Sequence, residues 1–282
     1  MLTVPDAPRF RMSSPPLVQA VAQINYPIVS RLQTLDGIAP VQDALSALFP
    51  YMNQQQVQEV SLMIGPAGPA MPNSAQSTVH VFTDDTGWSL SVTVGSASLS
   101  IGPQYAGVND FAGRFEQVCS ALHDAAGIRR CDRLGVRYLD LVEFGDDADD
   151  WASWFRPELV GLAHPDLSAS NLVASLTETR LQEAPTGVME GLEGVIEGLI
   201  RYGVVPPGSI MKGVPPRPVD HRAFLFDMDT FVATPQPFDP QRLSESYRTL
   251  HTEIEKVFHW AVSERGRVRF GYELVSDSED VS

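Results

Sequence analysis

Two aspartates have the spacing that a metal site or an acid–base pair requires. Asp227 and Asp229 lie two residues apart in HRAFLFDMDTFVA, which alternates as a β-strand does, so both carboxylates point to one face. Paired carboxylates can hold a divalent cation or share acid–base work. The sequence favours the other interpretation, a solvated strand face opposite Phe224 and Phe226. We therefore expect no metal, and Asp227 and Asp229 remain the candidates should one bind.

A second set of polar residues follows helical spacing near the end of the chain. His251, Glu255 and His259 are four residues apart, which places them on one face of a helix. Such a stripe can bind a metal, but the HExxH pattern and a third strong ligand nearby are missing. A polar helix face is the favoured interpretation.

Arginine and tyrosine interrupt the apolar segment RLGVRYLDLVEF at 133–144. Arg137 must be paired if it is buried, so we expect an ion pair between Arg137 and a neighbouring carboxylate. The alternative is a ligand or anion site formed by Arg133, Arg137, Tyr138 and Asp140.

Aromatic residues follow the acidic junction GDDADD at 145–150. Trp151, Trp154 and Phe155 cluster there. Core packing is the favoured interpretation, and a partner-binding patch is the alternative.

Sequence motifs for catalysis or cofactor binding are missing. The serines lack a nucleophile-elbow context, and GPAGPA lacks the lysine of a phosphate-binding loop. Cys119 and Cys131 show no CxxC or Cys/His spacing, and we expect two free thiols rather than a disulfide. We expect no cofactor, and a non-enzymatic role is favoured over an enzymatic one.

The chain is strongly acidic, with a net charge of −15 from 20 basic and 35 acidic residues. This balance disfavours binding to nucleic acid and to anionic membranes, since both attract clustered Lys and Arg. We expect instead a protein partner with a basic surface, and a homodimer is an alternative. With neither a signal-peptide core nor an 18-residue apolar run, the expected location is the cytoplasm.

Elements of both kinds are predicted along the chain. Residues 78–144 read as two strands joined by a turn at 84–87, a helix at 108–126 behind Asn109 or Asp110 as N-cap, and a strand at 133–144. Further strands are expected at 17–29, 57–65, 167–183 and 221–233, and further helices at 38–49, 151–162 and 240–261. Residues 188–205 fit strand or helix, and we favour a strand because it would form a hairpin with 167–183. The predicted class is α+β, with antiparallel sheets packed by long amphipathic helices.

Four regions are predicted: an extended arm over 1–15, two α+β halves over 16–145 and 146–272, and a flexible acidic tail over 273–282. Each half has strands followed by a long helix, so the two halves are candidates for an internal repeat.

The order of several segments resembles a sporadically distributed family of uncharacterised bacterial proteins of this length. The segments are PPLVQAVAQINYP, DTGWSLSVTVGSASLSIG, YAGVNDFAGRFEQVCSAL, DRLGVRYLDLVEF, FLFDMDTFV and LHTEIEKVFHWAVSERGR. The resemblance covers most of residues 15–265 and implies no established activity. The patchy distribution hints at defence-linked or mobile genes. The family strand ends in Asn where this chain has Asp140.

Three functions remain open. The first is a non-enzymatic protein that recognises another protein through an exposed strand or groove, in an antitoxin-like, chaperone-like or phage-defence role. The second is a small-molecule or nucleotide sensor with a pocket between sheet and helices near Arg137. The third is a metal-dependent hydrolase that uses Asp227 and Asp229.

Overall fold

The computed structural model describes residues 4–61, 64–65, 68–69, 73–143, 151–164, 172–182, 194–211 and 217–275. The chain forms two compact units that interleave along the sequence. Unit 1 comprises Met1–Val21, Gly135–Val232 and Ser246–Ser282, and unit 2 comprises Ala22–Leu134 and Ala233–Glu245. The predicted boundary at 145/146 and the acidic junction lie outside the described residues, as does the tail beyond 275.

Unit 1 is built on antiparallel strands in the order β11-β12-β15-β10-β2. Its strands are β1 (Phe10–Met12), β2 (Leu17–Asn25, partly in unit 2), β10 (Arg133–Glu143, beginning in unit 2), β11 (Ser175–Gln182), β12 (Glu197–Val205), β13 (Ile210–Met211), β14 (Arg217–Pro218), β15 (Ala223–Val232) and β17 (Tyr272–Leu274). Its helices are η2 (Trp151–Trp154), α3 (Pro157–Val160), η3 (Gly161–Ala163), α5 (Pro240–Ala261, beginning in unit 2) and α6 (Glu264–Arg269).

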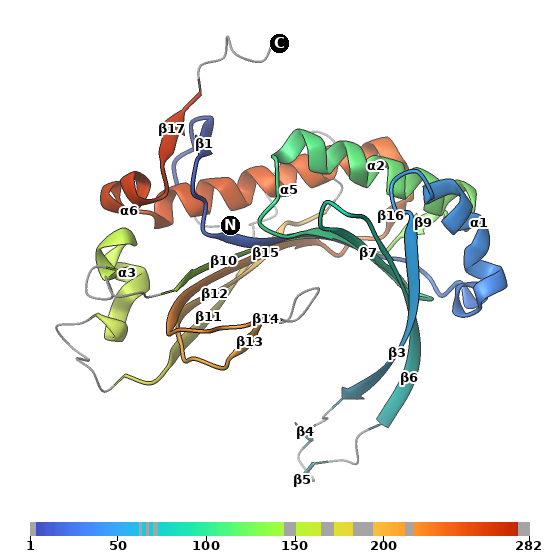
Figure 1. Ribbon diagram of the computed structural model, residues 1–282, viewed down its shortest axis with the longest axis horizontal. Coiled ribbons are helices and arrows are strands. Elements are labelled where there is room, and N and C mark those ends of the chain that lie inside the picture. The colour runs from blue at the N-terminus through green and yellow to red at the C-terminus, as the bar shows by residue number, and fades with distance from the viewer. Residues whose placement is uncertain are drawn as a thin grey trace. The chain divides into compact units, whose positions relative to one another are not determined.

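Helix α5 lies along one face of the unit 1 strands (Figure 1). It begins as the sequence predicts: Pro240 is its first residue, and the Asp239 carboxylate accepts a hydrogen bond from Arg242 N at 3.1 Å. Its apolar stripe is buried, as expected, at Leu243, Tyr247, Leu250, Ile254, Val257, Phe258 and Ala261. The burial of this stripe gives the helix its stability within the fold.

Unit 2 has antiparallel strands in the order β2-β8-β7-β6-β3. Its elements are η1 (Ser30–Gln33), α1 (Leu35–Leu45), β3 (Tyr51–Ser61), β4 (Ile64–Gly65), β5 (Gly68–Pro69), β6 (Asn73–Thr83), β7 (Trp88–Val92), β8 (Ser96–Ile101), α2 (Val108–Asp124), β9 (Arg130–Cys131) and β16 (Gln236–Pro237). The predicted turn joins β6 to β7: the Asp84 carboxylate accepts from Thr86 N and Trp88 N, each at 2.9 Å, and Gly87 has a φ of 95°. Cys119 and Cys131 are both buried free thiols, as predicted.

The α+β class is confirmed. The prediction of a strand within 188–205 is also correct for the residues of that segment that the structure describes. Residues Glu197–Val205 form β12, which pairs antiparallel with β11 as the expected hairpin. Residues 188–193 of that segment lie outside the described part of the chain.

Several predicted element boundaries are wrong for local reasons. Helix α2 spans Val108–Asp124, so it begins at the predicted residue but ends two residues early, and its N-cap is Gly107 rather than Asn109 or Asp110. Helix α1 begins at Leu35 because the Thr34 hydroxyl accepts from Gly37 N. The continuous helix expected over 151–162 is replaced by three short turns, η2, α3 and η3. Pro157, which lacks an N–H, begins a new helix there, and a positive φ at Gly161 ends it.

Candidate functional site

The candidate site lies in unit 1, on the face of strands β10, β15, β12 and β11 opposite helix α5. The alternation of β15 decides which side chains reach this face. Thr230 donates a hydrogen bond to Leu250 O of α5 at 3.1 Å, and the Phe226 ring lies 6.4 Å from that of Phe258. Because Asp227 differs from both in parity, its carboxylate points to the opposite face.

Asp227 is clamped by two arginines. Arg137 Nε lies 2.7 Å from Asp227 Oδ1 and Arg137 Nη2 lies 2.8 Å from Oδ2, a bidentate ion pair. Arg201 Nη1 donates to the same Oδ2 at 3.2 Å. The Asp227 side chain is only 3% exposed, so the two cations compensate a carboxylate that would be costly to bury alone.

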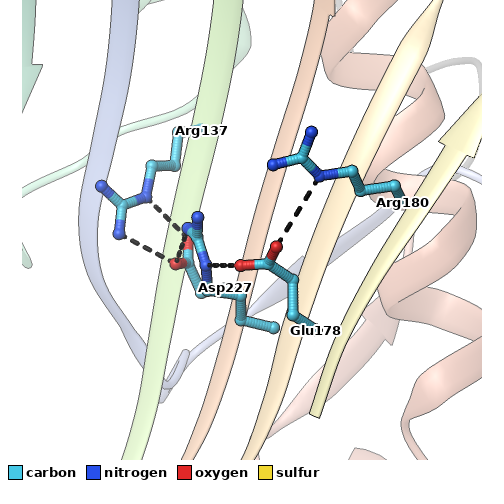
Figure 2. A network of polar contacts seen from close by, with 5 residues as sticks. Arg137, Glu178, Arg180 and Asp227 are labelled. Carbon is cyan, nitrogen blue, oxygen red and sulfur yellow. Dashed lines mark hydrogen bonds and ion pairs between the residues drawn. The ribbon is translucent and has the colours of Figure 1, made fainter. Parts of the chain in front are cut away.

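The hairpin register extends this contact across two more strands. Glu178 lies opposite Arg201, and Arg201 lies opposite Asp227. Arg201 Nε donates to Glu178 Oε2 at 2.8 Å, and Arg180 Nε is 3.7 Å from Glu178 Oε1. Figure 2 shows Arg137, Asp227, Glu178 and Arg180 in a row across the strands, with the Arg180 side chain reaching back over the sheet. We call Arg137, Asp227, Arg201, Glu178 and Arg180 the arginine network.

The network holds three guanidinium groups and two carboxylates, so it carries one excess positive charge on a protein with a net charge of −15. Partial burial lowers the pKa of Arg201, but its hydrogen bonds and charge contacts with Glu178 and Asp227 outweigh burial and raise it. These contacts favour the charged form of the Arg201 guanidinium.

This geometry corrects the interpretation of Asp227. The carboxylate does not lie on a solvated strand face but is buried and paired. Both of its oxygens accept hydrogen bonds from arginines, an arrangement suited neither to a metal ligand nor to a general base. The expected ion pair between Arg137 and a neighbouring carboxylate is present. Asp229 shares the strand face of Asp227 and is partly buried.

Two other residues of the predicted anion site, Tyr138 and Asp140, do not converge with Arg137. Tyr138 faces α5, where its hydroxyl lies 3.2 Å from that of Tyr247. Asp140 has the same parity and is buried, so both residues lie on the sheet face opposite Arg137. Arg133 belongs to unit 2. The four-residue site proposed from the sequence is therefore wrong as a single constellation, because Tyr138 and Asp140 point to the face opposite Arg137.

Asp140 is the most strongly perturbed carboxyl group in unit 1. Burial, and then the negative charge of Asp227, raise the pKa of Asp140 to about 8. A bound proton removes the charge that burial penalises, which makes this buried position tolerable.

The aromatic candidates are mostly core residues. Trp151 and Phe155 are buried, with their ring centroids 5.2 and 4.3 Å from that of Phe224. Trp154 is partly exposed, and the Arg269 guanidinium lies 5.3 Å from its ring centroid. Core packing is the correct interpretation for Trp151 and Phe155. A partner-binding patch that requires them is wrong, because their side chains do not reach the surface.

The histidine stripe on α5 is divided between separate contacts. His251 is buried, with Nε2 3.2 Å from Glu255 Oε1. His259 instead contacts Tyr272, whose hydroxyl lies 2.6 Å from Nδ1, and Arg267 at 3.2 Å. Burial, and then the charge of Arg267, lower the pKa of His259. Among the described residues, the structure contains no group of three His, Cys, Asp or Glu side chains arranged to hold a metal ion.

Three members of the network, Arg201, Glu178 and Arg180, were not among the residues selected from the sequence. Arg201 is the single charged residue within GLIRYGVV, and Glu178 alternates with Arg180 in SLTETRLQ. These signals were present, but only the register of the β11–β12 hairpin brings the side chains together.

Comparisons with protein-family models and with curated proteins find no match to this chain. Within the part of the chain that the structure describes, no helix is long and apolar enough to cross a membrane.

Proposed function

We propose that this is a non-enzymatic binding protein that recognises another protein by pairing with the outer edge of strand β11. The observation that carries the proposal is the position of β11. It is the last strand in its sheet, and among the described residues its only strand neighbour is β12. Its outer N–H and C=O groups are the kind of template to which a partner strand adds.

The exposure of β11 supports this role. The strand has no buried residue, and Leu176 is 56% exposed. An edge strand with apolar side chains would risk unselective pairing, whereas the charged Glu178 and Arg180 oppose it. The outer backbone groups of β11 are open to pairing, whereas its side chains are charged. This combination favours a partner strand whose own side chains complement those charges.

The net charge of −15 supports a partner with a basic surface. Opposite charge accelerates the encounter between two proteins, while the final register depends on local contacts. A second copy of this chain, paired edge to edge, is the alternative partner.

Two adjacent proline substitutions test the edge directly. Along an antiparallel strand, backbone N–H groups point alternately toward and away from the neighbouring strand. Of Leu176→Pro and Thr177→Pro, one removes a hydrogen bond to β12 and the other removes only an outward donor. The variant with the outward proline should retain the wild-type denaturation midpoint and lose the protein partner in an affinity pull-down with the full chain.

The exposed Arg242→Gln variant on α5 is the matched control and should retain the partner. If the wild-type protein sediments as a dimer and the same proline variant sediments as a monomer, the partner is a second copy of this chain. Retention of the partner by both proline variants would overturn recognition at the β11 edge.

A further inference from the structure

We propose that the arginine network is a binding site for a small oxyanion, a carboxylate or phosphate group, and that Glu178 occupies the position of the ligand's anionic group until it is displaced. This site is formed by side chains on one face of the sheet, whereas the proposed partner strand pairs with the outer backbone groups of β11. The proposal therefore goes beyond recognition of a protein strand by β11 and can hold or fail independently of it.

The two carboxylates of the network have different roles. Asp227 is 3% exposed and accepts hydrogen bonds from both Arg137 and Arg201, so it is a fixed part of the fold. Glu178 is 45% exposed and stands on the edge strand. Its contacts are a 2.8 Å hydrogen bond from Arg201 and a 3.7 Å approach to Arg180, which is too long for a hydrogen bond. A carboxylate held in this way on the surface can be exchanged at small cost.

Unused donors lie beside Glu178. Within the described part of the chain, Nη2 of Arg201 and both terminal nitrogens of Arg180 donate no hydrogen bond to the protein. Arg137 and Arg201 are each about one-third exposed, and Arg180 is 84% exposed. Planar guanidinium groups with free edges match the oxygens of carboxylate and phosphate.

The surrounding charge restricts the ligand to a small one. The protein as a whole carries −15, which repels a polyanion such as nucleic acid, while the network has an excess of one positive charge. Asp229 lies on the same face, two residues from Asp227 on β15. The unused guanidinium nitrogens belong to Arg201 and Arg180, so the site is centred on these two residues, at the side of the sheet where Glu178 stands.

Titration calorimetry at low ionic strength tests the site, with inorganic phosphate and acetate as separate probes. Glu178→Gln removes the internal competitor but keeps the shape of the side chain, and should bind the preferred probe about two- to tenfold more tightly than the wild type does. Arg201→Gln should weaken binding at least tenfold. The preferred probe tells whether the natural ligand carries a phosphate or a carboxylate group.

Arg242→Gln is the matched control, since it removes one exposed positive charge from unit 2, and it should leave the affinity unchanged. If Arg201→Gln does not fold, Arg180→Gln takes its place, because a side chain this exposed can be replaced without loss of the core. Its expected affinity is about threefold lower than that of the wild type. Equal affinity of wild type, Glu178→Gln and the arginine variant, or weaker binding by Glu178→Gln, would overturn the proposal whether or not the β11 edge binds a protein.

Discussion

Arg137 and Asp227 form a bidentate ion pair although they are 90 positions apart in the chain, with nitrogen–oxygen distances of 2.7 and 2.8 Å. The pair joins strands β10 and β15 on the face that α5 does not cover. Arg201 completes it by donating to the same carboxylate. One buried aspartate therefore holds two of the three arginines of the network in place.

Replacing Arg137 should destabilise the protein more than replacing an arginine in an exposed pair. Arg137→Gln leaves the buried Asp227 with Arg201 alone, and we expect a loss of about 1–3 kcal/mol in the free energy of unfolding, below the range for a fully buried pair. Arg11→Gln breaks the exposed pair with Glu273 and should cost less than about 1 kcal/mol. Urea denaturation of both variants measures these losses. Equal midpoints would show that the Arg137 pair contributes no more to the free energy of unfolding than the exposed Arg11 pair does.

Leu250 tests the packing of α5. Its side chain is fully buried, so Leu250→Ala should lower the free energy of unfolding by about 2–5 kcal/mol through lost burial and an added cavity. Val268→Ala, at a position that is 83% exposed, is the control and should be nearly neutral. An unchanged midpoint for Leu250→Ala in equilibrium denaturation would contradict the role of the apolar stripe as core.

Asp140 should make stability depend on pH in an unusual direction. An aspartate in the unfolded chain has a pKa near 3.9, whereas burial and then Asp227 raise the pKa of Asp140 in the folded protein to about 8. Between these values the folded state holds a proton that the unfolded state releases. The contribution of Asp140 is therefore fully present below about pH 4 and falls as the pH rises toward 8.

Asp140→Asn removes this titration. The stability of the variant relative to the wild type should grow between pH 5 and pH 8, by at most about 1.4 kcal/mol per pH unit. Denaturation curves of both proteins across that range provide the measurement. A difference that stays constant with pH would mean that Asp140 does not change its charge in the folded protein.

Association with the partner should slow as salt rises from low to physiological concentration. Exposed charges more than about 8–10 Å apart are screened under those conditions, and the net charge of −15 is the source of attraction to a basic partner. A pull-down and a nucleic-acid mobility-shift assay in one buffer series test this. Salt-sensitive retention of DNA or RNA, with no protein recovered, would contradict the partner prediction.

The local pattern of the sequence was enough to predict many elements. The alternation in β15 and β10, the turn at Asp84–Gly87 and the stripe of α5 each depend on neighbours within a few residues, so the α+β class followed from them. Element boundaries are harder to predict. The start of α1 depends on which side chain caps the backbone. The segment 151–162 contains a proline, which fits either the first turn of one helix or the start of a new one.

The sequence by itself determined that a buried Arg137 requires a carboxylate, because a buried cation without one is too costly. Only the tertiary structure decided that Asp227 is that carboxylate and that Arg201, Glu178 and Arg180 extend the row. The reason is that a strand specifies the parity of its own side chains, whereas the register between strands is set by pairing and packing over long sequence separations. The same register separated Arg137 from Tyr138 and Asp140, which adjacency in the sequence had grouped together.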